Sequence, residues 1–417
     1  ALPDPDTVKL PKEGKDMRTV LIPNVSVAFC KLLSGVLRKH GLRAVPLSLG
    51  ENIQIQVGKK YVHNDTCFPA QMVIGEAISA LQSGKYPLDK VAIGMAKYHG
   101  DCRLTHYSAL LRRALNAAGF EQVPIVSTDP IDSKEMHPCF RLGTLFNLRA
   151  LWVVTMMDML EELRRQIRPY ELNKGETNRI FDQTIDNIAR GIDKSILSGL
   201  KAYKRGIKEF RKIKYDKSKP RPRVFVTGEY LVTFHPGSNF HIEHYLEENG
   251  LEVILPRMAN VFYREYLARI FESKSLNVGF TKVNKIIDHV SAFFFKLALN
   301  VCEKSARKHP EYVPSTPLPK LAEETDEIMN RTFLSGEGWL IPGEIKEYAL
   351  RGVQSFVILQ PFGCLPNHIC GRGIMKKVKE EFPNVQILPL DLDPDTSFAN
   401  VENRLQMLIM NEKSRLS

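Results

Sequence analysis

The sequence predicts an α/β protein with two parallel sheets, and two observations carry this prediction. Short apolar runs typical of buried strands alternate with longer segments whose apolar residues have helical spacing. The alternation occurs twice in the 417 residues, once on each side of a long helical and basic stretch. Strands that alternate with helices pair in parallel, and helices then cover both faces of the sheet. We therefore expect two α/β halves that are alike in plan.

The first half begins with a β-α-β unit. Arg18–Pro23 is an apolar run suited to a buried strand, Ala28–His40 has helical spacing and ends at Gly41, and Leu42–Leu47 is the next strand. The further elements are, in chain order, a helix from Cys67 to about Gln82, a strand at Lys90–Gly94, a helix at Arg103–Ala118 and a strand at Gln122–Val126.

The second half repeats this order after the helical stretch Leu142–Lys214 and a linker at Tyr215–Pro222. Its elements are strands at Arg223–Thr227, Leu251–Leu255, Ser355–Leu359 and Val385–Asp391, helices at Ser238–Asn249 and about His368–Glu381, a helical stretch Val261–Ser315, and a helix from the capping Ser397 to about Asn411. We divide the chain into a tail (1–17), a first α/β domain (18–141), a helical, basic connecting region (142–222) and a second α/β domain (223–417) with a helical insertion over about 261–335.

The net charge of +11 comes almost entirely from one segment. Lys194–Arg223 holds twelve basic residues and two acidic ones, Glu209 and Asp216. The segment is either a solvated helix face with a linker or a docking surface for an anionic partner or phosphate-bearing ligand. Nucleic acid is not expected, because no zinc-finger or basic-zipper pattern accompanies the charge.

Cysteine usage and hydropathy indicate a cytoplasmic protein. The seven cysteines are dispersed, without the dense spacing of a disulfide framework, which favours a reducing compartment. No apolar run reaches the roughly 18 residues of a membrane span, and the polar, Pro-rich Ala1–Lys15 has no signal-peptide core.

Three cysteines follow predicted strands and precede predicted helices. They are Cys67, Cys102 and Cys364, and two of them lie in Cys-x-Pro, which suits a helix start. We expect the positive end of a helix dipole to favour the thiolate at each position. Ligands bind beyond the carboxyl ends of parallel strands, so the three thiols converge if the halves face each other. Thiolates from three turns are suited to an iron–sulfur cluster.

The other cysteines and nearby histidines are weaker candidates. Cys139 and Cys370 are conceivable additional ligands, whereas Cys30 and Cys302 lie within helical patterns and are expected to be buried. Zinc is the rival metal, but the close cysteine and histidine pairs of structural zinc sites are absent. A cubane held by three thiolates leaves one iron for substrate, and His99, His106 and His368 could act there as acid–base or supporting groups.

Four stretches together resemble the activase-associated relatives of the 2-hydroxyacyl-CoA dehydratases, a group that includes double-cubane cluster proteins. They are Asp65–Gln71, Gly100–Tyr107, Thr227–Tyr230 with Ser238-Asn239, and Gln360–Cys364 with Asp391–Asp395 and Asn403-Arg404. The resemblance spans about Arg18 to Leu408. It departs at Thr105, where the family commonly has glycine, and the chain has no nucleotide motif of its own.

The resemblance implies two flavodoxin-like, Rossmann-like domains with helical insertions and an oxygen-sensitive cluster at their interface. The cluster would be a 4Fe-4S cubane or a bridged 8Fe-9S double cubane, ligated by Cys67, Cys102 and Cys364. It also implies electrons from a separate ATP-dependent activase, an acyl-CoA or other small-molecule substrate, and a site lined by Glu229 and Asn239. The resemblance is also compatible with a dimer of this protein.

Three hypotheses follow. The first is an enzyme, a 2-hydroxyacyl-CoA dehydratase-like lyase or a cluster-dependent reductase that receives low-potential electrons, with Glu229 beside the histidines as a catalytic candidate. The second is a non-catalytic iron–sulfur electron carrier or cluster-assembly partner that docks through Lys194–Arg223. The third is a metal-free α/β protein with inert cysteines.

Overall fold

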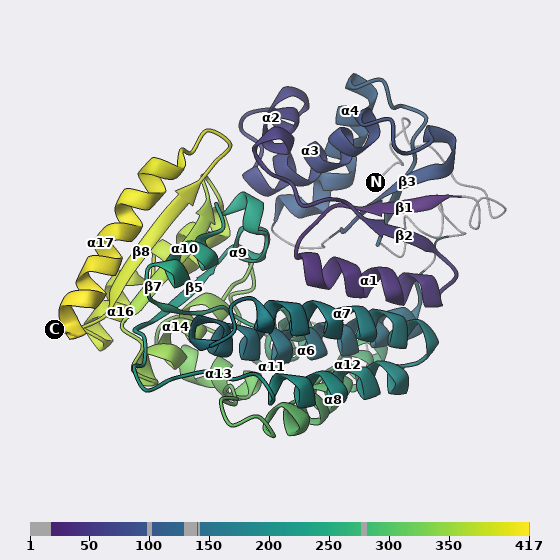
Figure 1. The fold of residues 1–417 in the computed structure, drawn as a ribbon. Helices are drawn as coiled ribbons and strands as arrows, with labels where there is room; N and C mark the ends of the chain where they lie inside the picture. The colour runs from purple at the N-terminus through teal and green to yellow at the C-terminus, as the bar shows by residue number, and fades with distance from the viewer. Residues whose placement is uncertain (1–17, 98–101, 129–139, 141, 277–281, 417) are drawn as a thin grey trace.

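Each half of the chain forms one four-stranded parallel sheet, and a layer of long helices packs beside both sheets (Figure 1). The structure is a computed structural model that describes residues 18–97, 102–128, 140, 142–276 and 282–416. The predicted α/β class with two parallel sheets is confirmed.

The first sheet has the strand order β2-β1-β3-β4. Its strands are β1 (Thr19–Ile22), β2 (Arg43–Pro46), β3 (Val91–Met95) and β4 (Ile125–Ser127). Its helices are α1 (Val27–Lys39), α2 (Asn52–Tyr61), α3 (Phe68–Gln82) and α4 (Tyr107–Ala117), with short 3-10 turns η2 (Leu88–Lys90) and η3 (Arg103–His106). Alternate residues of β1 point to opposite faces: Val20 packs with α1, whereas Leu21 packs with α3.

The second sheet has the equivalent order β6-β5-β7-β8. Its strands are β5 (Arg223–Gly228), β6 (Glu252–Ile254), β7 (Ser355–Pro361) and β8 (Gln386–Leu392). The accompanying elements are α9 (Tyr230–Phe234), η6 (Pro236–Ser238), α10 (Ile242–Glu248), α14 (Leu340–Leu350), α15 (Leu365–Asn367), the π-helical turn η7 (His368–Arg372), α16 (Met375–Glu381) and α17 (Phe398–Leu416). Val224 and Phe225 of β5 belong to different hydrophobic clusters, so both faces of this sheet are covered.

The helical layer surrounds α6. It consists of α6 (Thr144–Ile167), α7 (Glu176–Lys194), α8 (Ile196–Phe210), α11 (Met258–Ser275), α12 (Lys282–Ala306) and α13 (Leu318–Thr325), with the turn η5 (Arg168–Tyr170). Met156, Met159 and Leu160 of α6 are fully buried and share one hydrophobic core with α1 of the first half. Within the described ranges, no helix is both long and apolar enough to cross a bilayer.

The basic segment Lys194–Arg223 contains the helix α8, and its lysines lie on the outer side of that helix. Lys201, Lys204 and Lys208 are exposed, whereas Tyr203 and Ile207 on the opposite side are buried. The helix is therefore amphipathic, with its charges in solvent. Its docking role stays a prediction.

Several sequence-based boundaries were wrong, among them the start of β4, which is Ile125 and not Gln122. The helix expected from Ser238 begins at Ile242, because Phe240 and His241 adopt left-handed φ values of 58° and 54° that interrupt a helix. The last helix runs to Leu416, beyond the expected end at Asn411.

A buried carboxylate joins the two halves. The backbone N–H groups of Asn24 and Gly50 each donate to Glu76 of α3 at 2.6 Å. His235, which follows α9, contacts the same carboxylate through Nε2 at 3.0 Å. Its Nδ1 accepts a hydrogen bond from Ser238 N–H at 3.1 Å, so Nε2 carries the proton that is donated to Glu76. Close packing accompanies this contact, because a Cβ on Gly237 would lie 1.8 Å from the carbonyl oxygen of Gly50.

Replacing Glu76 with glutamine is expected to lower the free energy of unfolding by about 2–3 kcal/mol, because an amide cannot accept from all three donors. Guanidinium unfolding measures the change. The matched control is Glu51→Gln in the exposed Glu51–His241 pair, which contributes little because it is solvated. Equal midpoints for both variants would contradict the assigned role of Glu76.

Candidate metal-cluster site

Cys67 lies at the N-cap of α3, where Pro69 occupies the first turn as the sequence predicts. The prediction that it lies at the end of a strand was wrong, because the helix α2 lies between β2 and this cysteine. Its sulfur lies 2.8 Å from the hydroxyl of the buried Tyr107, the first residue of α4. Tyrosine can donate to a thiolate, so α4 supports the sulfur from a neighbouring element.

Cys102 lies at the N-cap of the turn η3, and its sulfur accepts from Leu104 N–H at 3.5 Å. The next residue, Arg103, donates to the carbonyl of Asp65 at 2.6 Å. Asp65 lies two residues before Cys67, so this bond holds the loops of the two cysteines together.

Cys364 follows β7 and forms the N-cap of α15. Gly363 precedes it with φ of +70°, a conformation that glycine adopts without strain. The side-chain amide of Asn367 lies 3.7 Å from the sulfur and donates to Glu337 at 2.8 Å. Glu337 also accepts from Tyr230 N–H at 2.9 Å, which connects this loop to α9.

The three cysteines share one electrostatic neighbour, Glu229. Burial is the main cause that raises the pKa of Cys67, Cys102 and Cys364, and a negative charge on Glu229 would raise each pKa further. Glu229 caps the helix α9 by accepting from Val232 N–H at 2.9 Å. The preceding Gly228 has φ of +144°, and a Cβ there would lie 1.8 Å from the carbonyl oxygen of Leu359, so only glycine fits this turn.

The expectation that helix dipoles favour the thiolates was wrong for the free protein. Burial raises the pKa of Cys102 to about 11 and of Cys364 to about 12, and it also raises the pKa of Cys67. Loss of solvation outweighs the nearby N–H groups, and the carboxyl groups of Glu229 and Glu337 add to the shift at Cys102 and Cys364. A coordinated metal deprotonates such a thiol directly.

Glu229 and Glu337 form a pair of acids beside the thiols. Burial raises the pKa of Glu229 to about 8, and the charge of Glu337 contributes further. Burial also raises the pKa of Glu337. Two adjacent carboxyl groups with little access to water hold a proton near neutral pH, which allows them to give it to a nearby acceptor.

The histidine and asparagine candidates occupy different surroundings. His106 is exposed at the end of η3, and His368 is half-buried with an Nδ1 that has no hydrogen-bond partner among the described residues. Asn239 is buried, donates to the carbonyl of Val232 at 2.7 Å and lines a cleft behind α9. His99 lies outside the described residues.

The remaining cysteines are dispersed. Cys370 is fully buried in the core beneath the second sheet, and its thiol donates to the carbonyl of Pro366 at 2.9 Å. Cys30 and Cys302 are buried in α1 and α12, as their helical patterns predict. Cys139 lies outside the described residues.

No three histidine, cysteine or acidic side chains in the described part of the chain lie close enough to hold a single metal ion. Each thiolate of a cubane binds a different iron, so its ligands are more widely spaced than those around one zinc ion. Three partly exposed thiols from three turns are a donor set of the type that iron–sulfur clusters use.

Sequence reasoning missed three supporting residues: Tyr107, Glu337 and Asn367. Two of them had a local signal, because Tyr107 begins the helix after Cys102, and Asn367 lies three residues after Cys364. Glu337 had none, since it reaches the site only through the packing of its loop against α9 and α15.

No protein-family model matches this chain, and a search of curated proteins found no relative.

Proposed function

We propose that this protein binds an iron–sulfur cluster through Cys67, Cys102 and Cys364. We further propose that it acts as a low-potential reductase or dehydratase-like component supplied with electrons by a separate ATP-dependent activase. The carrying observation is that three thiols each lie at a helix or turn start. The Arg103–Asp65 bond joins the loops of Cys67 and Cys102, and Glu337 joins the loop of Cys364 to α9.

The topology supports this proposal. The order 2-1-3-4 in each sheet matches the first four strands of the flavodoxin-like order 2-1-3-4-5, in which ligands lie beyond the carboxyl ends of the strands. Cys102 follows β3 and Cys364 follows β7, so each sheet contributes a thiol from a central strand. The Glu76–His235 contact holds the two sheets against each other beside this edge.

The residues around the thiols have separable roles. A bound cluster would supply single electrons at low potential, and an iron without a protein ligand would offer a position to a substrate oxygen. Tyr107 and Asn367 direct hydrogen-bonding groups at the sulfurs of Cys67 and Cys364, and such bonds tune a cluster's reduction potential. Glu229 and Glu337 hold a proton that a departing hydroxyl or a reduced substrate requires.

Anaerobic purification followed by iron and sulfide analysis and EPR tests the proposal. A cubane gives about four irons and four sulfides per chain, and a double cubane gives about eight and nine. Protein without iron after both anaerobic expression and chemical reconstitution would refute the proposed function.

The second candidate is an electron carrier, and the exposed lysines along α8 favour it as a docking surface. The same EPR experiment separates the two functions. Added cyanide or thiolate changes the spectrum of a cluster with an open iron, whereas a carrier whose irons all have thiolate ligands gives an unchanged spectrum.

A further inference from the structure

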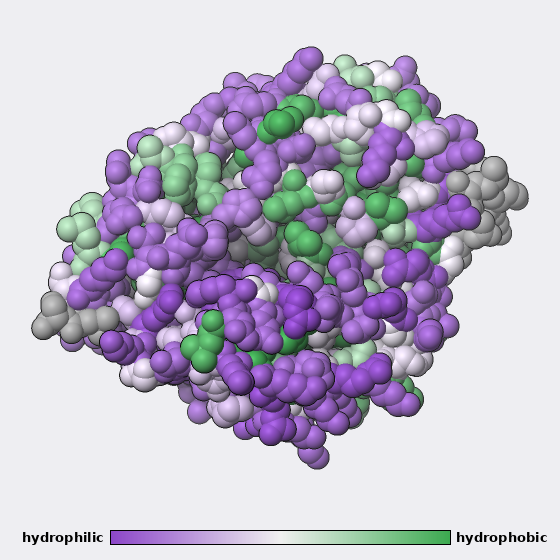
Figure 2. All heavy atoms as spheres, in the orientation of Figure 1, coloured by the Kyte–Doolittle hydropathy of each residue, from purple (hydrophilic) through white to green (hydrophobic). Residues whose placement is uncertain are grey.

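A cleft of about 300 Å³, lined by both charged and apolar side chains, lies behind α9, on the side facing the helical layer. It opens between α1, α6 and α7 on one side and α9 and α10 on the other, where Figure 2 shows the surface hollowed. Lys31 and His241 at its rim are 43% and 50% exposed, whereas Asp158 and Thr233 deeper inside are 4% and 3% exposed. The cleft thus leads from solvent into the interior.

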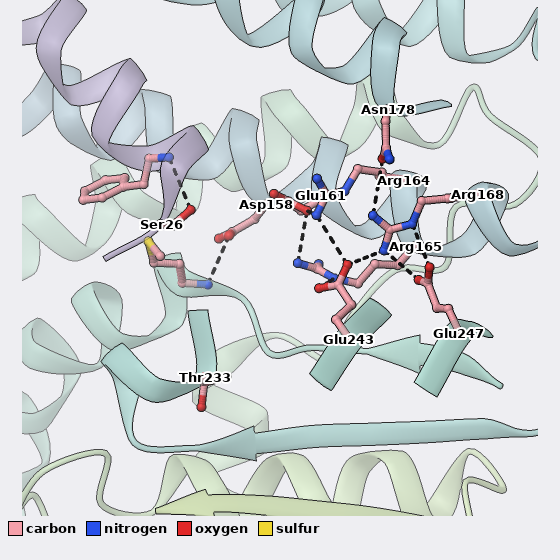
Figure 3. Close-up of polar contacts among 12 residues, drawn as sticks. Ser26, Asp158, Glu161, Arg164, Arg165, Arg168, Asn178, Thr233, Glu243 and Glu247 are labelled. Carbon is pink, nitrogen blue, oxygen red and sulfur yellow. Dashed lines mark hydrogen bonds and ion pairs between the residues drawn. The ribbon is translucent and has the colours of Figure 1, made fainter. Parts of the chain in front are cut away.

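The charges that line this cleft are already neutralised (Figure 3). Glu243 contacts the guanidinium groups of Arg164, Arg165 and Arg168, and Arg168 also pairs with Glu247 at 2.7 Å. Burial alone would raise the pKa of Glu243, but the three arginines outweigh it and hold that pKa well below its ordinary value. With its charges paired, the cleft has no excess charge to select an ionic ligand, and its volume and its charged lining groups allow it to hold water.

A second, smaller cavity lies directly inside the cleft. Its volume of about 20 Å³ is enough for a water molecule. Thr233, Phe234, Pro256 and Arg257 line both spaces, so the small cavity adjoins the cleft at these residues. Tyr230, Glu337 and Glu344 line the small cavity from the interior side.

Two hydroxyl groups at this cavity are buried and unpaired. The Oη of Tyr230 and the Oγ1 of Thr233 have no hydrogen-bond partner among the described residues. A buried hydroxyl without a partner costs about 1–3 kcal/mol, and native proteins usually satisfy such groups. A water in the small cavity would satisfy both, because both residues line it.

We propose that Thr233 and Tyr230 hold ordered water that carries protons from the cleft to Glu337, and so to the acid pair beside the three cysteines. Glu337 is placed to receive them, because it lines the small cavity and also contacts Asn367 beside Cys364. Burial raises the pKa of Glu344, on the same cavity wall, to about 8, so this carboxyl can take part in the exchange near neutral pH.

The delivery of protons for reduction rests on the proposed function. The low-potential donor protein supplies the electrons that reduce the substrate. For each electron that stays on the substrate, one proton moves inward along the water route. After the acid pair gives a proton to the substrate, Glu337 recovers one from the cleft. The proton transfer along this route neither consumes nor forms water. The water route itself requires no cluster, and its test therefore uses the protein before iron is added.

Deuterium uptake by the buried carboxyl groups tests the route. The protein is mixed with D2O, and the carbonyl stretch of protonated carboxyl groups is followed by infrared spectroscopy, with Glu344→Gln used to assign one band. Thr233→Val and Tyr230→Phe are expected to slow the exchange at least about tenfold, because each removes a hydroxyl from the route. Exchange at the wild-type rate in both variants would overturn the proposal.

Matched controls are Thr155→Val and Tyr203→Phe. Their hydroxyls are also buried, but they donate to Leu151 and Cys302 carbonyls at 2.8 and 2.9 Å, outside both cavities. Both controls should exchange at the wild-type rate. The thermal midpoint gives a second measurement: Thr233→Val should lower it if water bonds the hydroxyl, whereas a higher midpoint would show a dry cavity and refute the route.

The two proposals can fail independently. Slow deuterium exchange in Thr233→Val together with no bound iron in the wild type would support the water route but contradict its role in cluster-dependent reduction. Bound iron in the wild type together with unchanged deuterium exchange in the Thr233 and Tyr230 variants would support the cluster and contradict the water route.

Discussion

Replacement of Cys67, Cys102 or Cys364 by serine is expected to reduce bound iron to less than about a tenth of the wild-type content in each variant. A serine hydroxyl is a poor iron–sulfur ligand, and each thiol comes from a separate turn that no neighbouring cysteine of the described residues can replace. Iron and sulfide analysis after anaerobic reconstitution measures the loss. Full iron content in one variant would remove that cysteine from the ligand set.

Two buried cysteines provide the controls. Cys30→Ala and Cys302→Ala remove thiols that lie in helices α1 and α12 at 1% and 0% exposure. These variants should keep wild-type iron, although truncation in the core lowers their stability slightly. Iron loss in them as large as in the serine variants would indicate damage to the fold and not loss of a ligand.

Replacement of Gly237 by alanine is expected to destabilise the protein by about 3 kcal/mol, the upper end of the usual cost of overpacking. The added methyl group would lie 1.8 Å from the backbone oxygen of Gly50, and neither backbone segment can yield without separating the two halves. Guanidinium unfolding measures the change. Iron content should fall as well, because Cys67 and Cys364 come from different halves.

Gly143→Ala is the matched control. A Cβ at Gly143 meets no atom within 4 Å, and its φ of −100° is open to alanine. Its effect should stay below about 1 kcal/mol, the usual range for a helix N-cap substitution. If both variants unfold at the same denaturant concentration, the close contact between Gly237 and Gly50 is not present in solution.

Local patterns predicted the secondary structure well where neighbouring residues decide the conformation. The helix expected over Ala28–His40 is α1 at Val27–Lys39, because Ser26 accepts from Phe29 N–H at its start and Gly41 ends it with φ of +76°. The helices α2 and α14 were missed, and so was the short helix α9. It contains only five residues and is held by Glu229 and by contacts with distant Glu337, which no local pattern contains.

The candidate site was predictable in its ligands and not in its electrostatics. Cys-x-Pro indicates a helix start at Cys67 and Cys364, and both cysteines are N-caps. The same argument failed for the pKa values, because the helix N-terminus acts over one turn while burial depends on every element that covers the sulfur. Burial decided the shift at all three thiols.

Local patterns were sufficient to predict the α/β class, the helix or turn starts at the three cysteines and the amphipathic character of the basic helix α8. These properties depend on side-chain periodicity and on residues within one helical turn. Only the tertiary structure joined Glu337 to both α9 and the loop of Cys364, brought His235 to Glu76 of the other half, and made Thr233 a wall of two cavities. The physical reason is that close packing between distant segments fixes burial, and burial sets both the cost of an unpaired polar group and the pKa of an acid.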